Sequence, residues 1–318
     1  MNSGGLDFRT LSGRDLAALG LGTQEIVDAI ADAVRQMAAG RLHAPPKTGV
    51  LPGDGRYVMT TLSVADPSLP VVAKLVSVQP ANPAQGLPAI NGAILVMDGQ
   101  TGVLRAVMGA NWITAARTAG MSALMAQHMA DPAAEVIAFI GCGVQARAHL
   151  AAFAELFPLS RVLAFGRGAA NTDALLAEAR ALGLTAEAAP TARAALEQAQ
   201  IVISAVTRAP DLQPFLDAAW LAPGSFAAVT DVALPWLPET LGAIDRIIID
   251  DLTQERVMKP PMLDLDLVWG DMADVVTGRR VATHQPDRRQ AFIFRGQALA
   301  DHALAALALA RADGSAGK

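Results

Sequence analysis

Residues 136–167 constrain the fold of this chain more than any other segment. An apolar run, Val136–Ile140, leads into Gly141-Cys142-Gly143-Val144-Gln145-Ala146, and a helical pattern and a second apolar run follow. Gly141 permits a tight turn, Gly143 removes a side chain where phosphates approach the backbone, and small Ala146 lets the helix pack close to a sheet. Because the free N–H groups at a helix N-terminus attract anions, this segment predicts a site for a dinucleotide's pyrophosphate. A purely structural strand-to-helix turn is the alternative.

The second apolar run indicates which dinucleotide is preferred. NAD sites place a carboxylate about 20 residues beyond the glycines to hold the ribose hydroxyls. Here the run Arg161–Phe165 ends in Gly166-Arg167, with no Asp or Glu at its tip. An arginine suits a 2′-phosphate, so the sequence favours NADP(H), with NAD as a second option. The alternative is that Arg167 is a solvated loop residue.

Length and composition limit the class of protein. The chain has 318 residues, enough for two domains and a substantial core, and 52% of them are hydrophobic. No uncharged apolar run reaches the roughly 18 residues that span a bilayer. The first residues lack the basic and apolar regions of a signal peptide. We therefore expect a cytoplasmic protein with no membrane partner.

Charge and metal-ligating residues exclude further classes. The net charge is −5 and no basic cluster is present, which argues against nucleic acid as a partner. The five histidines are scattered without ligand spacing, so no metal is predicted. The single cysteine, Cys142, cannot form an internal disulfide, and its small size explains its place in the glycine turn better than nucleophilic chemistry does.

The second half of the chain alternates between strand and helix patterns, with Pro158, Gly183, Pro190 and Pro223 marking helix stops and starts. Such alternation predicts an α/β fold with a doubly wound parallel sheet. The expected strands lie near 136–140, 161–165, 185–189, 201–206, 226–230 and 246–250.

The first 110 residues have an α+β pattern. An amphipathic helix is expected from about Thr23 to Ala39, followed by strands near 57–62, 71–78, 93–98 and 103–108. The string Asp98-Gly99-Gln100-Thr101-Gly102 predicts a hairpin turn between the last two strands. Further helices are expected at Thr114–Met129 and Gln297–Arg311, and the second of these must bury one face.

Several strings occur together and in order: Lys74-Leu75-Val76, Gly86-Leu87-Pro88, Asp98 with Thr101-Gly102, Ile113-Thr114-Ala115-Ala116-Arg117-Thr118-Ala119, and the glycine turn. In this combination the chain resembles the ornithine cyclodeaminase and mu-crystallin family of NAD(P)-dependent enzymes. The resemblance covers nearly the whole sequence. It implies a Rossmann-type domain, residues 116–294, inserted into a smaller α+β domain, residues 1–115 with 295–318, that binds substrate and forms a homodimer.

Family members act on ornithine, alanine-like amino acids or cyclic ketimines such as pyrroline-2-carboxylate. Each substrate carries a carboxylate beside the carbon that gives or takes hydride. The resemblance implies that Lys74 and Arg117 bind this carboxylate, which cations suit because charge-assisted hydrogen bonds are strong. Lys47 falls where the family usually has a second arginine. The alternatives are an edge-strand lysine for Lys74, a helix-surface residue for Arg117 and a plain loop lysine for Lys47.

Asp231 follows the expected strand 226–230, at the sheet edge where ligands of this fold bind. The resemblance implies that an aspartate in this loop exchanges a proton with the substrate nitrogen, so Asp231 and Lys74 are the predicted catalytic residues. A loop-capping aspartate is the alternative. The resemblance further places cofactor contacts at Thr114, Arg117, Thr118, Thr207 and Val229, in addition to the glycine turn and Arg167.

The sequence departs from the family pattern near its end. A Phe-Lys-Ser-x-Gly string usually lies near the nicotinamide, but this chain has Phe292-Ile293-Phe294-Arg295-Gly296. Met108-Gly109 also replaces a usual Asp-Gly. These departures argue against the ornithine reaction, and the expected preference for NADP(H) favours net reduction of a small amino or cyclic α-imino acid. The alternatives are an ornithine cyclodeaminase and a catalytically idle NADPH-binding protein.

Overall fold

The computed structural model describes residues 7–209 and 211–315 and divides into two compact units. Unit 1 contains residues 1–117 and 297–318, and unit 2 contains residues 118–296. Helix α3, Ala110–Met129, carries the chain from unit 1 into unit 2. It begins four residues before the predicted start at Thr114.

Unit 1 is built on a seven-stranded sheet of order β1-β7-β6-β5-β4-β2, in which β3 also pairs with β4. All pairs are antiparallel except β1 with β7. The predicted hairpin turn is confirmed, because Asp98 Oδ1 accepts hydrogen bonds from the backbone of Gln100 and Thr101 between β6 and β7. The strands are β1 Arg9–Leu11, β2 Leu42–His43, β3 Thr48–Val50, β4 Tyr57–Ala65, β5 Val71–Val78, β6 Ile90–Met97 and β7 Leu104–Gly109.

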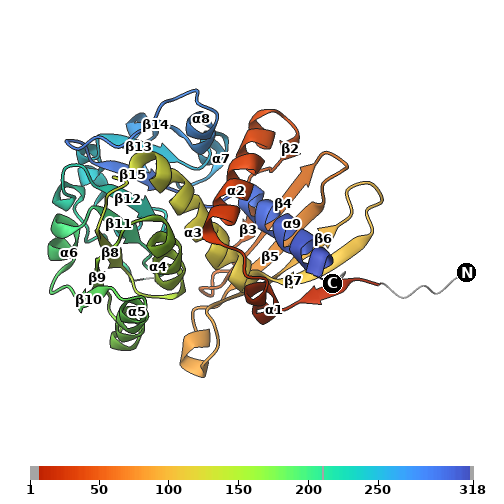
Figure 1. Ribbon diagram of the computed structural model, residues 1–318, viewed down its shortest axis with the longest axis horizontal. Coiled ribbons are helices and arrows are strands. Elements are labelled where there is room, and N and C mark those ends of the chain that lie inside the picture. The colour runs from red at the N-terminus through yellow and green to blue at the C-terminus, as the bar shows by residue number, and fades with distance from the viewer. Residues whose placement is uncertain (1–6, 210, 316–318) are drawn as a thin grey trace, which may run out of the picture. The chain divides into compact units, whose positions relative to one another are not determined.

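Helices cover one face of this sheet. Helix α9, Ala298–Ser315, packs on β4, β5 and β6 and against α2, Thr23–Ala38 (Figure 1). The predicted apolar stripe of α2 is buried at Ile26, Ile30 and Val34. Because side chains alternate along a strand, the face under α9 is buried while the other face exposes leucines. The shorter elements are α1 Gly13–Ala18 and η1 Asn82–Gln85.

Unit 2 contains an eight-stranded sheet in which every pair is parallel, in the order β10-β9-β8-β11-β12-β15-β13-β14. The predicted Rossmann-type α/β class is therefore confirmed. Six strands lie where the sequence placed them, and β14 and β15 were not predicted. The strands are β8 Val136–Ile140, β9 Arg161–Phe165, β10 Thr185–Ala188, β11 Ile201–Ser204, β12 Phe226–Val229, β13 Arg246–Ile249, β14 Val268–Asp271 and β15 Gln290–Ile293.

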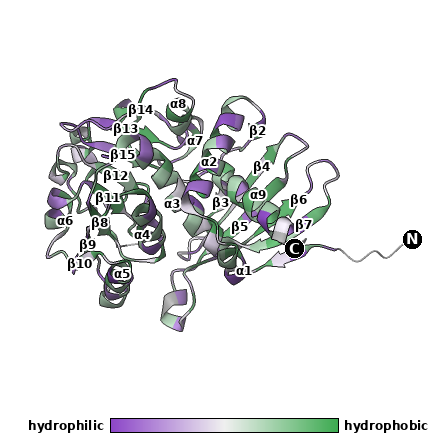
Figure 2. Ribbon diagram, viewed as in Figure 1, coloured by the Kyte–Doolittle hydropathy of each residue, from purple (hydrophilic) through white to green (hydrophobic). Residues whose placement is uncertain are grey.

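Both faces of the central strands are buried, as a parallel sheet requires. Every residue of β11, β12, β13 and β15 is buried, and Figure 2 shows hydrophobic residues along the middle of the sheet. Trp236 is among the largest fully buried side chains. The helices of unit 2 are α4 Val144–Leu156, α5 Ala169–Ala181, α6 Ala192–Gln198, α7 Leu252–Val257, α8 Met272–Val276, and the short η2 Ala218–Trp220, η3 Pro238–Ala243 and η4 Leu265–Leu267.

The strand order reverses between β8 and β11. Strands β9 and β10 extend from one side of β8, whereas β11 and β12 lie on its other side. In sheets of this kind the crevice at the carboxyl ends of the strands on either side of such a switch point binds the ligand. The glycine turn follows β8, so it lies at this point.

The described residues lack two features, a membrane-spanning helix and a group of metal ligands. Among them, no helix combines the length and apolar character needed to cross a membrane. Within residues 7–209 and 211–315, no three His, Cys, Asp or Glu side chains are grouped so as to hold a metal ion.

Candidate active site

The glycine turn lies directly against the loop that follows β11. Gly141 has φ +90°, which favours glycine, and a Cβ there would lie 2.5 Å from the carbonyl oxygen of Ala205. Both the backbone conformation and the close approach therefore require glycine at this position. Burial raises the pKa of the neighbouring Cys142 thiol, which agrees with a packing role for that residue.

The start of α4 fits a dinucleotide's phosphates. Gly143 is the N-cap, makes no side-chain cap, and has open space where a Cβ would point. Ala146 is fully buried, so the helix packs closely, while Val144 is exposed. The side-chain Oε1 of Gln145 is buried without a hydrogen-bond partner in the described structure. An open cradle beside an unsatisfied polar atom is what an absent ligand would explain.

Other predicted cofactor residues belong to the same edge of the sheet. Arg167 is exposed and lies two residues beyond the end of β9. Thr207 is exposed three residues after β11, and Val229 is the buried last residue of β12. All three therefore lie at or just beyond the carboxyl ends of strands neighbouring the switch point.

Asp231 lies two residues after β12 and is only 8% exposed. Its Oδ2 accepts hydrogen bonds from Ser204 Oγ at 2.6 Å and from the Val206 backbone N–H at 3.0 Å. Its Oδ1 is buried and has no hydrogen-bond partner among the described residues. Burial raises the pKa of Asp231 to about 6, although the hydrogen bonds from Ser204 and Val206 oppose the increase. Asp231 thus accepts a hydrogen bond from a loop backbone N–H, as a loop-capping aspartate does, and is also a buried carboxyl group with a raised pKa.

Asp231 and the glycine turn are connected through two consecutive residues. Gly141 packs on the carbonyl of Ala205, and the next residue, Val206, donates its backbone N–H to Asp231. A carboxyl group with a raised pKa thus lies at the same sheet edge as the phosphate cradle. Perturbed titratable groups in such crevices are candidates for proton transfer.

Unit 1 buries a cluster of opposite charges under α9. Lys74 Nζ lies 2.7 Å from both carboxylate oxygens of Asp301, and Arg117 Nε lies 3.3 Å from Oδ1. The side chains of Lys74 and Asp301 are each 2% exposed. Lys74 is on β5, between β4 and β6, so the edge-strand alternative is wrong. Arg117 is buried in α3, which excludes the helix-surface alternative.

Neighbouring groups complete the cluster and set its ionisation. Thr61 Oγ1 donates to Asp301 Oδ2 at 3.1 Å. Burial alone would raise the pKa of Asp301, but the charges of Lys74 and Arg117 outweigh it, so the pKa is lowered. Burial lowers the pKa of Lys74, and the charge of Asp301 opposes this effect. Burial also lowers the pKa of His302, which contacts Ser63 Oγ at 3.2 Å, to about 4.

Asp301 was not among the site residues predicted from the sequence. The available signal was the pair Asp301-His302 inside an otherwise alanine- and leucine-rich helix. Two polar residues on a helix with so few others need an explanation when that helix is buried.

The remaining predicted residues are Lys47 and two threonines of α3. Lys47 is half-buried immediately before β3, whose first residue, Thr48, pairs with Thr60 of β4. Thr114 and Thr118 flank Arg117 on α3. Because α3 begins at Ala110 and not at the predicted Thr114, Arg117 is the eighth residue of the helix and lies beyond its N-terminal turn.

The departures from the family string are packing residues. Ile293 is buried in β15, and the ring of Phe294 is buried and stacks on Phe292 with centroids 4.6 Å apart. Arg295 pairs with the buried Glu255, its Nε lying 2.8 Å from Oε2. Buried apolar side chains, Ile293 and Phe294, thus occupy the two positions where the family string usually has Lys and Ser.

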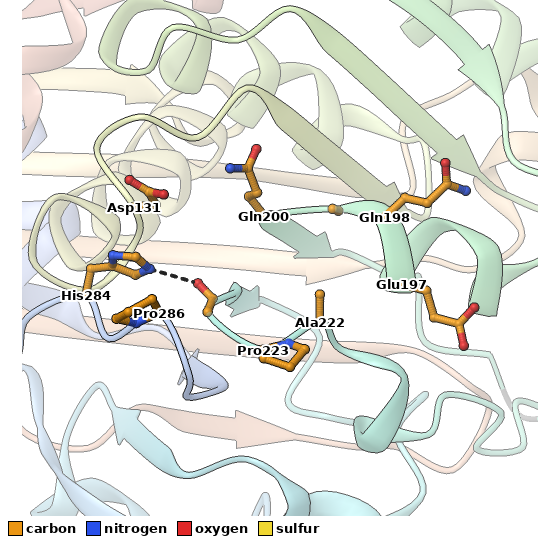
Figure 3. Close-up of a pocket in the computed structure, with 10 residues that line it drawn as sticks. Asp131, Glu197, Gln198, Gln200, Ala222, Pro223, His284 and Pro286 are labelled. Carbon is orange, nitrogen blue, oxygen red and sulfur yellow. Dashed lines mark hydrogen bonds between the residues drawn. The ribbon is translucent and has the colours of Figure 1, made fainter.

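Unit 2 has a surface pocket of about 170 Å³ (Figure 3). It is formed by residues that precede strands, including Gln200 before β11, Gly224 before β12 and His284 before β15. His284 Nε2 donates to the Gly224 carbonyl at 3.2 Å. The pocket is therefore at the amino ends of the strands, the edge opposite the glycine turn.

The glycine turn at the switch point of a fully parallel sheet defines a Rossmann-type nucleotide-binding fold. The model of the ornithine cyclodeaminase/mu-crystallin family matches residues 18–307, and the chain belongs to this family. The recognition made from the sequence motifs is confirmed.

Individual relatives include several reductases. Delta(1)-pyrroline-2-carboxylate reductase 1 of Burkholderia multivorans is 30% identical over 273 residues, covering 83% of this chain and 84% of the relative. The Delta(1)-pyrroline-2-carboxylate/Delta(1)-piperideine-2-carboxylate reductase of Azospirillum brasilense is 29% identical, with 93% of each chain covered. The structure of the Thermococcus litoralis Delta(1)-pyrroline-2-carboxylate reductase, in complex with NADH and L-proline, has a TM-score of 0.88 at 24% identity, covering 97% of this chain and 98% of that one. The last similarity establishes the fold.

Proposed function

We propose that this chain is an NADP(H)-preferring reductase of cyclic α-imino acids such as pyrroline-2-carboxylate. The observation that supports the proposal is the connection of Gly141 to Asp231 through Ala205 and Val206, which brings a buried carboxyl group close to the glycine turn. The reductases among the relatives support the substrate class.

The cofactor is held by residues of unit 2. The N–H groups at the start of α4 would donate to the pyrophosphate, and the open space at Gly143 would accommodate it. Arg167 binds the 2′-phosphate, since no carboxylate follows β9 to hold free ribose hydroxyls. A bound dihydronicotinamide supplies the hydride, which carries two electrons to the substrate carbon.

The substrate carboxylate is attracted by the charge cluster of unit 1. The three side chains, Lys74, Arg117 and Asp301, together carry two positive charges and one negative charge, and a substrate carboxylate can form charge-assisted hydrogen bonds with the cations. Lys47, near Thr60 and Thr61, adds a third cation to this end of the sheet.

Asp231 exchanges the proton. In the reductive direction its protonated carboxyl gives a proton to the substrate nitrogen while the adjacent carbon receives hydride. A pKa of about 6 leaves part of the population protonated near neutral pH.

The test is to mix the purified chain with NADPH and pyrroline-2-carboxylate and to follow the nicotinamide absorbance. We expect oxidation of NADPH that falls about 10²–10⁴-fold in Asp231→Asn. Asp173→Asn, an exposed aspartate on α5, is the matched control and should retain the rate. Binding of NADPH without turnover of any imino or keto acid would support an idle protein instead, and formation of proline from ornithine with NAD⁺ would support a cyclodeaminase.

Cofactor preference is tested separately. Arg167→Asp should lower the preference for NADPH over NADH, because it removes the 2′-phosphate partner and supplies a ribose acceptor. An unchanged ratio of kcat/KM values would contradict the role of Arg167.

We also propose that unit 1 forms a homodimer through the exposed face of its sheet. Leu62 and Leu95 lie in one cross-strand row through Ala73, and Leu75 lies in the next; these leucines are 42–58% exposed. An apolar sheet face of this extent is typical of an association surface, and the family resemblance implies a second copy as its occupant. Sedimentation velocity should show a dimer that dissociates in Leu75→Glu but not in Leu182→Glu, an exposed leucine of unit 2.

A further inference from the structure

A chain of three buried side chains ends at Asp231. The Trp236 Nε1 donates to Ser204 Oγ at 3.1 Å, and Ser204 Oγ donates to Asp231 Oδ2 at 2.6 Å. An indole N–H can only donate, so it engages the serine oxygen as acceptor and leaves the hydroxyl hydrogen for the aspartate. The direction of both hydrogen bonds is therefore fixed by the chemistry of the groups.

This arrangement makes the two oxygens of Asp231 different. Oδ2 accepts from Ser204 and from the Val206 backbone N–H, which together occupy its lone pairs. Oδ1 has no hydrogen-bond partner among the described residues. A proton on Oδ2 would face two donors, so the neutral acid carries its proton on Oδ1.

The loop that follows is held in an unusual conformation. Val232 and Ala233 have φ of +53° and +58°, a region that side chains with a Cβ rarely adopt. The loop is fixed by the backbone hydrogen bonds Leu234 N–H to Asp231 O and Trp236 N–H to Ala233 O. Strain of this kind persists where the surrounding structure over-determines it, and it clusters at functional sites.

We propose that Ser204, supported by Trp236, is a positioning residue that binds Oδ2 of Asp231 and so makes Oδ1 the oxygen that exchanges the proton with the substrate nitrogen. The inference rests on the proposed reductase function and adds the two residues that orient its acid. Neither residue touches the substrate in this account, since both act through Asp231.

The reaction step balances with a single proton. The O–H bond at Oδ1 breaks and an N–H bond forms, while the carbon of the C=N bond takes the hydride and the double bond becomes single. The substrate is reduced, the nicotinamide is oxidised, and Asp231 is left as a carboxylate whose Oδ2 is already stabilised by two donors. Solvent restores the proton before the next turnover.

The same hydrogen bond sets the pH at which Asp231 titrates. Burial raises its pKa to about 6, and the bond from Ser204 lowers it. Among the described groups, no charged side chain contributes to this shift. The groups that lower the pKa are the hydroxyl of Ser204 on β11 and backbone N–H groups of Val206 and of the strained loop. Loss of the serine hydroxyl therefore leaves the effect of burial less opposed.

The test is a direct titration of Asp231 in the cofactor-free chain, using NMR of ¹³C-labelled aspartate carboxyl groups and Asp231→Asn to identify the signal. Ser204→Ala should raise the pKa of Asp231 by about one unit, as expected for a hydrogen bond to a charged acceptor. Ser204→Thr keeps the hydroxyl and should restore the wild-type titration, and Trp236→Phe should give a smaller increase. Circular dichroism checks that each variant is folded.

The pH profile of the reaction gives a second readout. Reduction requires the protonated acid, so kcat/KM should fall at a higher pH in Ser204→Ala than in the wild type. If part of the pH profile of kcat/KM reflects ionisation of the substrate itself, that part should be the same in the wild type and Ser204→Ala, and it serves as an internal control. An unshifted carboxyl titration in a folded Ser204→Ala variant overturns the role of Ser204, even if the wild type is active. Absence of turnover by the wild type overturns the reductase proposal, while the titration still measures the positioning.

Discussion

Asp301 of unit 1 and Asp231 of unit 2 are both buried, but their hydrogen-bond and charge partners differ. Asp301 of unit 1 lies 2.7 Å from Lys74 and 3.3 Å from Arg117, and its pKa is lowered. Asp231 of unit 2 has only neutral hydrogen-bond donors, and its pKa is raised to about 6. Burial raises the pKa of both groups, so the partners decide the outcome.

Asp301 carries a fixed negative charge, whereas Asp231 can be protonated or ionised near neutral pH. A carboxylate between two cations stays ionised and can organise their charges for a substrate. A carboxyl group held by neutral donors can gain or lose a proton near neutral pH. The same residue type therefore ionises differently in the two environments.

The strongest test of this difference is the substitution Asp301→Asn. It leaves two buried cations without their anion, and breaking a buried ion pair costs about 3–5 kcal/mol. We expect the free energy of unfolding, measured with urea, to fall by that amount. The double variant Asp301→Leu/Lys74→Met removes one charge of each sign and should recover part of the loss. Equal losses in both variants would show that the charges do not stabilise one another.

The same change in unit 2, Asp231→Asn, should have the opposite sign. The pKa of about 6 in the folded state exceeds the ordinary value of 3.8, so the folded state binds more protons between these values and its stability falls as pH rises through about 6. Asn cannot ionise, so the variant should be more stable than the wild type above this range by up to about 3 kcal/mol and nearly equal below 3.8. Urea unfolding at several pH values measures the difference.

In that experiment, two buried histidines make the free energy of unfolding depend on pH in the opposite direction. The pKa values of His149 and His302 are lowered from 6.5 to about 4, so their contribution to stability is present above 6.5 and is lost as pH falls through 4. Both histidines are common to the wild type and the variant, and the difference between the two curves isolates Asp231. A difference that does not change with pH would contradict the raised pKa.

The two cations of the unit 1 cluster, Lys74 and Arg117, predict stabilisation by a carboxylate ligand. L-Proline at ten times its Kd should raise the free energy of unfolding by about 1.4 kcal/mol. The effect should be much smaller in Arg117→Gln, which removes one cation, than in Asp173→Asn. Equal stabilisation of these two variants would place the ligand elsewhere.

The fold was predictable where the sequence pattern is strong. Strand β8 and the amphipathic helix α2 have the expected positions because apolar residues mark them directly. Strands β14 and β15 have four residues each, and β14, Val-Trp-Gly-Asp, begins with only two apolar residues. Their strand conformation comes from pairing with β13, which a short local pattern does not encode.

The site was predictable only in part, for a similar reason. Asp231 could be found because it follows a strand at the ligand-binding edge. Asp301 could not be paired with Lys74 from the sequence, because 227 residues separate them. The hydrogen bonds that link Trp236 to Ser204 and Ser204 to Asp231 were also not predicted. A serine at a strand end and a buried tryptophan are ordinary in sequence, and their hydrogen bonds exist only in the folded chain.

The smallest effect concerns the neutral donor to Asp301. Thr61→Val removes the hydrogen bond from Oγ1 to Oδ2 and keeps the side-chain shape, so it should cost about 1 kcal/mol of unfolding free energy. Thr61→Ser retains the hydroxyl and controls for the change in packing. Because Lys74 and Arg117 still hold the charge, Asp301 should remain ionised in Thr61→Val, and carboxyl NMR should show no titration near neutral pH. Loss of the neutral donor from Asp231, in contrast, should move its titration by about one unit. Equal sensitivity of the two aspartates to loss of a neutral donor would remove the distinction between them.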